Sequence, residues 1–92
     1  MEKISFSNKI AWQVLPNKKF AYACNLKTRQ YYQFEDSAMT MWLSIADNEP
    51  VYRDDLIEIV SRHYEVEKDV VRDDIDEFLN SLYQEGLIDY NE

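Results

Sequence analysis

The stretch DIDEFLNSLYQEGLI, from Asp74 to Ile88, is the most informative part of the sequence. Its apolar residues recur three or four positions apart, which is typical of a helix that buries one side. Gly86 is the only glycine in the chain, and glycine commonly follows the last turn of a helix because it adopts positive φ at little cost. The stretch therefore predicts a helix that begins near Lys68 and ends before Gly86, with Leu87 and Ile88 packed back beneath it.

The apolar face of this helix is wider than one core contact requires. A stripe somewhat wider than about 100° covers one core face, whereas the apolar positions here, together with Asp74, spread over roughly 220°. These positions are Val70, Val71, Asp74, Ile75, Phe78, Leu79, Leu82 and Tyr83. We expect Ile75, Phe78 and Leu82 to pack mainly in the core. Val70 and Asp74, on one margin of the arc, are expected to serve a second contact.

Two further helices are predicted upstream, because apolar residues keep a helical spacing from residue 38 to residue 63. Asp36 and Ser37 precede the first of them and have the residue types of a helix N-cap. Pro50 ends it, since the residue before a proline is disfavoured in the α region. The positions expected to face inward are Ala38, Met39, Met41, Trp42 and Ile45 in the first helix, and Leu56, Ile57, Ile59, Val60 and His63 in the second.

Residues 10–34 follow a different period, because their β-branched and aromatic side chains alternate as in half-buried strands. The turn residues Pro16, Asn17 and Lys18 separate the first strand from the second, and residues 25–28 separate the second from the third. The alternating positions are Trp12 and Val14, then Phe20, Tyr22 and Cys24, then the strand from Arg29 to Phe34. The sequence therefore predicts a three-stranded antiparallel sheet followed by three α-helices, which is an α+β fold.

The third predicted strand closes the sheet and is therefore expected to be an edge strand. Proteins usually protect exposed edges with charged residues, proline or bulges. Here Tyr31, Tyr32 and Phe34 are accompanied only by the charge of Arg29. An unprotected edge beside a helix with a second apolar contact indicates a groove that accepts an added strand.

Composition excludes several classes of function. The chain has 92 residues, which is the size of one domain, and 46% of them are hydrophobic. Eighteen acidic residues against ten lysines and arginines give a formal charge of −8. This balance disfavours nucleic acid and anionic membranes as partners. One cysteine makes no internal disulfide, and no apolar run reaches the roughly 20 residues of a membrane span. We expect a soluble, cytoplasmic domain.

The residue types needed for catalysis are present only singly. His63 and Cys24 are the only histidine and cysteine, and no third group is evident that would orient them as a catalytic pair. We interpret His63 as a residue favoured at a helix C-terminus and Cys24 as a small buried side chain. Trp12 and Trp42 are interpreted as core anchors of the sheet and the first helix. No catalytic residue and no cofactor are predicted.

Acidic residues gather on the last helix. They point around much of its circumference, and no glycine-turned calcium loop accompanies them, so a solvated face is expected rather than a metal site. The same charges would attract a basic peptide, because complementary charge raises association rates. The residues are Asp69, Asp73, Asp74, Asp76 and Glu77.

The residues quoted above resemble those of the PqqD-like family. The stretch from Asp74 to Ile88 is similar to the family's ending D-V-x-x-F-L-x-x-L-x-x-x-G-L-[IV], and residues 34–42, FEDSAMTMW, are similar to its strand-to-helix junction L-N-x-[ST]-A-x-x-[IL]-[WL]. Residues 56–64 resemble its middle helix, so the resemblance covers residues 10–88. Glu35 stands where the family usually has Asn, and Tyr52 where Ser or Thr often caps the middle helix.

The resemblance implies a winged helix-turn-helix-like module, residues 1–92, that binds the leader segment of a ribosomally synthesised precursor peptide. Such modules are called RiPP recognition elements. The leader adds as a strand to the third strand and lies against the third helix. The module then presents the precursor to a modifying enzyme, such as a radical-SAM maturase or the leader peptidase and cyclase of lasso-peptide pathways, and performs no chemistry itself. The implied peptide-binding residues are Gln30, Tyr31, Tyr32, Gln33, Phe34, Val70, Val71, Asp74, Ile75 and Phe78.

Two other functions share this coarse layout. A winged-helix DNA-binding regulator would need a basic recognition helix, and the last helix has only Lys68 and Arg72 against a majority of acids. A small assembly domain would pair its edge strand with a second copy of itself, which predicts a dimer without any ligand.

Overall fold

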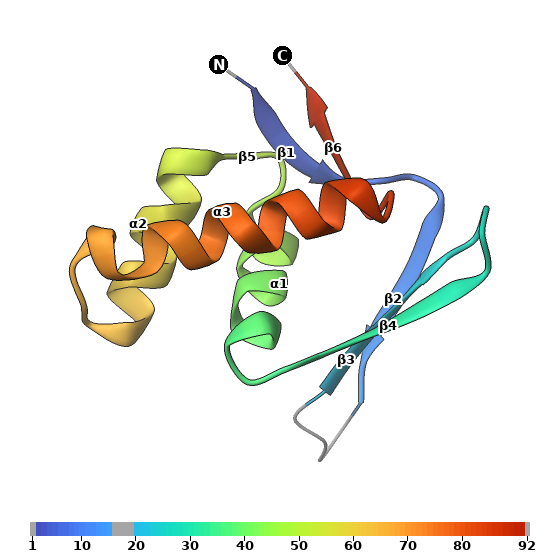
Figure 1. Ribbon diagram of the computed structural model, residues 1–92, viewed down its shortest axis with the longest axis horizontal. Coiled ribbons are helices and arrows are strands. Elements are labelled where there is room, and N and C mark those ends of the chain that lie inside the picture. Colours follow the sequence, from blue (N-terminus) through green and yellow to red (C-terminus); the bar gives the residue numbers. More distant parts are fainter. Residues whose placement is uncertain (1, 16–19, 92) are drawn as a thin grey trace.

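The computed structural model describes residues 2–15 and 20–91, and Figure 1 shows how their elements are arranged. The predicted turn at Pro16, Asn17 and Lys18 lies outside these residues. The elements are β1 (Lys3–Phe6), β2 (Ile10–Val14), β3 (Phe20–Asn25), β4 (Gln30–Glu35), α1 (Ser37–Asn48), β5 (Val51–Tyr52), α2 (Arg53–Tyr64), α3 (Lys68–Gln84) and β6 (Ile88–Asn91). The described part of the chain is thus an α+β fold, with the predicted three strands and three helices in the predicted order.

A second antiparallel sheet, in the order β5-β1-β6, was not predicted from the sequence. Its strands are two to four residues long, too short for a period-two pattern to stand out. β1 pairs with β6 in the register Lys3↔Asn91 to Phe6↔Ile88, so the first and last described strands lie side by side (Figure 1). Ile4, Leu87 and Ile88 are buried, which confirms that Leu87 and Ile88 pack back beneath α3.

The predicted sheet has the order β2-β3-β4, and its register decides which side chains face the helices. Trp12, Ala23 and Tyr32 form one cross-strand row, and Val14, Ala21 and Phe34 form the next. Ala21 and Ala23 are buried, so the inner face of β3 is made of small residues beneath the core aromatics. Phe20, Tyr22 and Cys24 lie on the opposite face and are half-buried, so the interpretation of Cys24 as a buried side chain was wrong.

Trp42 is the centre of the core and joins the two sheets. Its fully buried ring stacks on Phe6 of β1 at 4.3 Å and on Phe34 of β4 at 4.5 Å between ring centroids. Trp12 meets it edge to face at 5.9 Å but stays 39% exposed, so only Trp42 is a buried anchor as predicted. The indole N–H of Trp42 has no hydrogen-bond partner among the described residues.

The start of α1 differs from the predicted N-cap. The Asp36 side chain makes no capping hydrogen bond, because the chain leaves β4 abruptly and Asp36 adopts a φ of 54°. The backbone carbonyl of Asp36 instead accepts the N–H of Thr40. The other end agrees with the prediction, since α1 ends at Asn48, two residues before Pro50.

In α2, Leu56, Ile57 and Val60 are buried as predicted, whereas His63 is exposed in the last turn and contacts the ring of Tyr64. His63 was therefore wrongly assigned to the inner face, because the helix reaches past the core at that point. Helix α3 begins at Lys68 and ends before Gly86, as predicted. Gly86 has a φ of 73°, and a Cβ there would lie 2.8 Å from Nδ2 of Asn25.

Candidate functional site

Strand β4 is an edge of its sheet, as the sequence predicted. It pairs with β3 from Gln30 to Glu35, and no other described strand pairs with its second side. On that side every second residue of an antiparallel edge directs its backbone N–H and C=O groups outward. The five residues from Gln30 to Phe34 carry no charged side chain and no proline. The edge is therefore available for pairing with another extended chain.

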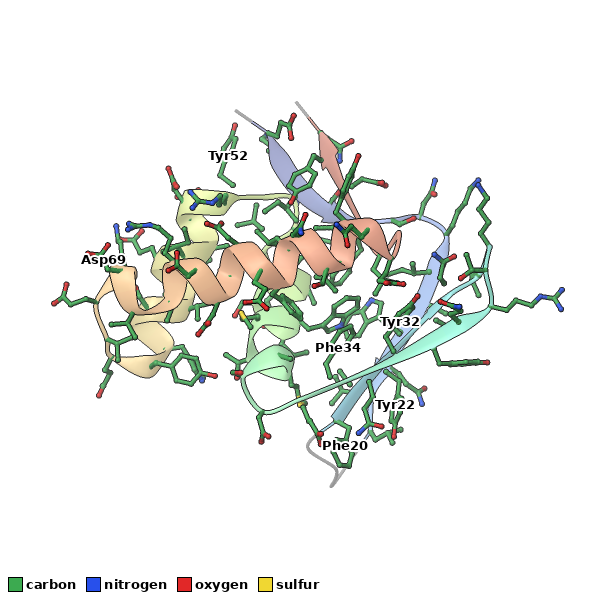
Figure 2. All side chains as sticks on the ribbon, in the orientation of Figure 1. Phe20, Tyr22, Tyr32, Phe34, Tyr52 and Asp69 are labelled. Carbon is green, nitrogen blue, oxygen red and sulfur yellow. The ribbon has the colours of Figure 1, made fainter. Side chains whose placement is uncertain are left out.

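Side chains of β4 alternate between the two faces of the sheet. Tyr32 and Phe34 point toward α3 (Figure 2), whereas the register of β3 and β4 places Tyr31 and Gln33 on the opposite face with Tyr22. Phe34 is buried and meets the ring of Phe78 on α3 edge to face, with 5.8 Å between ring centroids. Tyr31 is 77% exposed. A chain paired with β4 would thus meet α3 on one face only.

Helix α3 presents a side to this edge that differs from its core side. Val70, Asp74 and Phe78 follow one another at four-residue spacing, so they lie on one side of the helix. Val70 is 62% exposed, Asp74 is exposed and Phe78 is half-buried. On the core side, the buried residues are Val71, Ile75, Leu79 and Leu82. We call the edge of β4 together with Val70, Asp74 and Phe78 the β4–α3 surface.

Two contacts join the C-terminal end of α3 to the sheet. The Tyr32 hydroxyl donates to Oε2 of Glu85 at 2.5 Å, and the side-chain oxygen of Gln30 lies 2.9 Å from the same hydroxyl. The hydrogen bond to Glu85, together with burial and the charge of Glu85, raises the pKa of Tyr32 to about 12. The buried side chain of Asn25 donates to the backbone carbonyl of Glu85 at 2.9 Å. The β4–α3 surface is therefore held together at this end.

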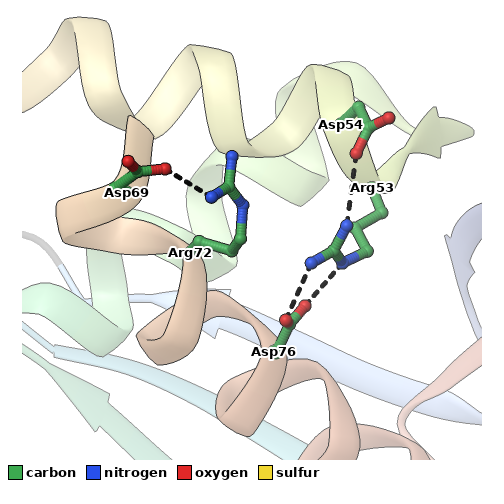
Figure 3. Close-up of polar contacts among 5 residues, drawn as sticks. All are labelled: Arg53, Asp54, Asp69, Arg72 and Asp76. Carbon is green, nitrogen blue, oxygen red and sulfur yellow. Dashed lines mark hydrogen bonds and ion pairs between the residues drawn. The ribbon is translucent and has the colours of Figure 1, made fainter. Parts of the chain in front are cut away.

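The opposite side of α3 is fixed to α2 and β6. Arg53 of α2 binds Asp76 of α3 through two hydrogen bonds, Nε–Oδ1 at 2.5 Å and Nη2–Oδ2 at 2.8 Å (Figure 3). These bonds to Arg53 hold the pKa of the Asp76 carboxyl below its ordinary value. Tyr83 packs on Tyr90 of β6 with 5.1 Å between ring centroids. This side of α3 is an internal contact of the fold.

The charge near the β4–α3 surface is negative. Asp73, Asp74 and Glu77 are exposed on α3 and take part in none of the ion pairs found among the described residues. Asp69 and Asp76, in contrast, pair with Arg72 and Arg53. Three unpaired carboxylates on one helix favour a cationic ligand.

Residues that could act in catalysis or bind a metal form no cluster in the described part of the chain. Cys24 lies on the outer face of β3 and His63 at the end of α2, in different parts of the molecule (Figure 1). Within residues 2–15 and 20–91, no three His, Cys, Asp or Glu side chains are placed to hold a metal ion. None of the described helices has the length and apolar composition needed to cross a bilayer.

The predicted site residues therefore do not all lie on one surface. Tyr32 and Phe34 face α3, and Val70, Asp74 and Phe78 share the side of α3 that carries the contact between Phe78 and Phe34. Tyr31 and Gln33 lie on the opposite face of the sheet. Val71 and Ile75, only 7% and 0% exposed, lie in the core. Whether these residues contact a peptide stays a prediction. Glu85 and Asn25 were not predicted from the sequence, and the only signal for them was their place beside Gly86 and the β3–β4 turn.

Residues 23–88 match the family model described as Coenzyme PQQ synthesis protein D (PqqD). A solved structure, TbiB1 in complex with the TbiA(beta) leader peptide, resembles this fold with a TM-score of 0.79. The likeness covers 92% of this chain and 94% of that chain at 15% sequence identity, so it concerns the fold alone. No match was found among curated proteins.

Proposed function

This chain belongs to the PqqD family, and on that premise we propose that it binds the leader segment of a ribosomally synthesised precursor peptide. The leader adds as a strand to β4. The observation that carries the proposal is the uncharged edge from Gln30 to Phe34, whose outer side pairs with no other described strand and which lies beside Phe78 of α3. TbiB1, which has a similar fold, is a protein whose structure includes a leader peptide.

Strand addition divides recognition between backbone and side chains. Backbone groups of Gln30 to Phe34 supply hydrogen bonds to any extended peptide, which gives affinity without sequence preference. Alternate leader side chains then face α3, where Phe78 and Val70 offer apolar contacts. Val71 and Ile75 support this wall from the core side. The remaining leader side chains lie beside Tyr31 and Gln33.

Charge favours a leader with basic residues. Asp73, Asp74 and Glu77 carry no partner among the described residues, and Asp74 adjoins Val70 and Phe78 on the same side of α3. Complementary charges of this kind increase the association rate more than the final affinity. The leader class that fits is therefore apolar at alternate positions and cationic toward the N-terminal half of α3.

The protein acts as a peptide chaperone and not as an enzyme. It holds the leader so that the rest of the precursor reaches a tailoring enzyme, such as a radical-SAM maturase or the leader peptidase and cyclase of a lasso-peptide pathway. In this view residues 1–92 form one winged helix-turn-helix-like peptide-binding domain that acts in the cytoplasm. DNA binding is disfavoured because α3 has two basic residues, one of which, Arg72, is paired with Asp69.

An amide NMR titration tests the proposal. The labelled protein is titrated with the leader encoded by a short reading frame beside its gene. We expect shifts confined to residues 29–34 and to the side of α3 from Val70 to Phe78, with a Kd of about 1 μM or below. No shift at high peptide excess would contradict the pairing. Sedimentation of the free protein separates this outcome from the alternative, since pairing of two β4 edges would give a concentration-dependent dimer without leader.

A further inference from the structure

The charges of this protein are unequally divided along the chain. Residues 1–34 contain six lysines and arginines and a single acid, Glu2, whereas residues 35–92 contain four basic and seventeen acidic residues. The first segment contains β1 and all of the β2–β3–β4 sheet except Glu35, and the second contains the three helices with β5 and β6. The net charge of −8 therefore belongs to the helical half, and the sheet half is positive.

The outer face of the β2–β3–β4 sheet, which points away from α3, is hollowed. Ala11 and Cys24 are cross-strand neighbours on this face and form the floor of the hollow. Tyr22, Leu26 and Tyr31 rise around them, and the hollow holds about 280 Å³. Leu26 is 55% exposed and Tyr31 is 77% exposed. An opening of this size fits one large apolar side chain of another molecule.

Three cationic residues lie next to residues that line this hollow. Lys27 directly follows Leu26, and Arg29 lies two residues before Tyr31 in the chain. Lys9 adjoins Leu26, because the backbone carbonyl of Lys9 accepts the N–H of Leu26 at 2.9 Å. All three side chains are exposed and absent from the ion pairs of the described residues. Among the strand residues on this face, Glu35 at the end of β4 is the one acid.

We propose that the outer face of the β2–β3–β4 sheet is a second docking surface, which binds an acidic protein surface through one protruding apolar side chain. Large exposed aromatic and aliphatic side chains with a charged border are the composition of a protein interface centre and rim. The border selects an acidic partner, because its charges are complementary to carboxylates and are not already neutralised.

Other occupants fit this face less well. A second copy of the chain would bring the same cations, Lys27 and Arg29, against each other across a symmetric contact. A cationic leader is repelled here and attracted to the opposite, acidic half. The net charge of −8 repels nucleic acid as it approaches the protein.

The surface is continuous with the β4 edge, because Tyr31 belongs to both. A protein docked on the outer face would therefore lie beside a leader paired with β4. That this partner is the enzyme receiving the precursor rests on the proposed function, whereas the docking surface itself does not. The two surfaces accept opposite charges, so they select different ligands.

Two short synthetic peptides test the proposal. One has a phenylalanine between two pairs of glutamates, and the other has the same phenylalanine between two pairs of lysines. We expect the acidic peptide to shift the amides of Cys24, Leu26 and Tyr31 with a Kd of about 1 mM or below. Because Cys24 is the only cysteine, intact-mass spectrometry also measures its alkylation rate, which the acidic peptide should lower. The basic peptide should do neither.

Charge reversal supplies the matched variants. The double variant Lys27→Glu with Arg29→Glu should lower the affinity for the acidic peptide by about tenfold. The control double variant on the helices, Arg62→Glu with Lys68→Glu, should leave that affinity unchanged. The proposal would be overturned if the acidic peptide shifted amides of the helices only, or shifted no amide at up to about 10 mM peptide. Equal affinity of both charge-reversed proteins for the acidic peptide would also overturn it. Tighter binding of a short single-stranded DNA to the same amides would also overturn it. Failure of the leader proposal is measured separately, from the amides between Val70 and Phe78 on α3 in the leader titration, because Arg29 and Tyr31 belong to both tests.

Discussion

The two sides of helix α3 have opposite roles. Toward α2 and β6, Asp76 is bound by Arg53 and Tyr83 packs on Tyr90, so that side makes contacts within the fold. Toward β4, Val70 and Asp74 remain exposed, and the described contacts with the sheet are those of Phe78 and of Glu85 just beyond the helix. One helix thus combines a closed side, which contributes to stability, with an open side, which is available for binding.

This difference explains the width of the apolar arc in the sequence. A helix with one partner needs a single stripe, but α3 has a core stripe of Val71, Ile75, Leu79 and Leu82 and a separate margin at Val70. Changes on the closed side should therefore alter the free energy of unfolding and leave binding intact. Changes on the open side should do the reverse.

The largest expected effect is a loss of stability when the core between the two sheets loses its central ring, Trp42. Trp42→Ala removes the ring that stacks on Phe6 and Phe34, and it leaves a cavity between the two sheets. We expect the free energy of unfolding to fall by about 3–5 kcal/mol, measured by urea denaturation. A loss below about 1 kcal/mol would mean that the stack does not join the sheets. Trp42→Phe, which keeps most of the contact, is the milder control.

On the open side, Val70→Ser should weaken leader binding about tenfold, which is about 1.4 kcal/mol. Val70 is 62% exposed, so its loss should change the free energy of unfolding by less than about 0.5 kcal/mol. Calorimetric titration with the leader measures the affinity. Val66→Ser is the matched control, because Val66 is also exposed but lies in the turn before α3. Equal affinities for the two variants would place the leader elsewhere.

On the closed side, Asp76→Asn should lower the free energy of unfolding by about 1 kcal/mol at pH 7, because the pair with Arg53 is partly exposed. Arg53 lowers the pKa of Asp76, so the pair contributes fully above the ordinary carboxyl value of 3.8. Its contribution should disappear as pH falls through the lowered value. Denaturation of both proteins from pH 7 to pH 2 measures this convergence.

Asp69→Asn is the control for that experiment, since Asp69 pairs with Arg72 at an exposed position and should contribute little. Leader affinity should be the same for Asp76→Asn and the unaltered protein. Reduced leader affinity in Asp76→Asn would show that the two sides of α3 are coupled.

The smallest effect concerns the contact between Tyr32 and Glu85. Tyr32→Phe removes one partly exposed hydrogen bond, for which we expect about 0.5 kcal/mol of unfolding free energy. The bond favours the protonated phenol, so its contribution is present below pH 10 and declines as pH rises toward 12. Ultraviolet titration of the tyrosines should show one group near pH 12 that the variant lacks. Identical titration curves would contradict the contact.

The elements with long, regular patterns were predictable from the sequence. Helix α3, the glycine that follows it and the β4 edge were all placed correctly, because each depends on local spacing. The second sheet was not, since β1 and β6 are four residues each and pair across almost the whole chain. Trp12 was wrongly predicted as a buried anchor for a related reason. Alternation of apolar residues indicates which face of a strand is turned inward, but it does not indicate how far the core extends over that face.

The candidate site was predictable to the same degree. The sequence separated Val70 from Ile75 because their angles on the helix differ, and the structure has one exposed and the other buried. It did not reveal the contact between Tyr32 and Glu85, whose partners lie 53 residues apart and carry no pattern. Contacts between single polar side chains of distant segments depend on the tertiary fold.

The pairing of β1 with β6 has a consequence for how this domain can be joined to other proteins. The start of β1 and the end of β6 lie at neighbouring points, on the other side of α3 from β4 (Figure 1). A linker attached to either end, or to both, would leave the β4 edge unobstructed. A domain with adjoining terminal strands can be fused to another protein at either end, or inserted into a surface loop of one, with no change in its own architecture.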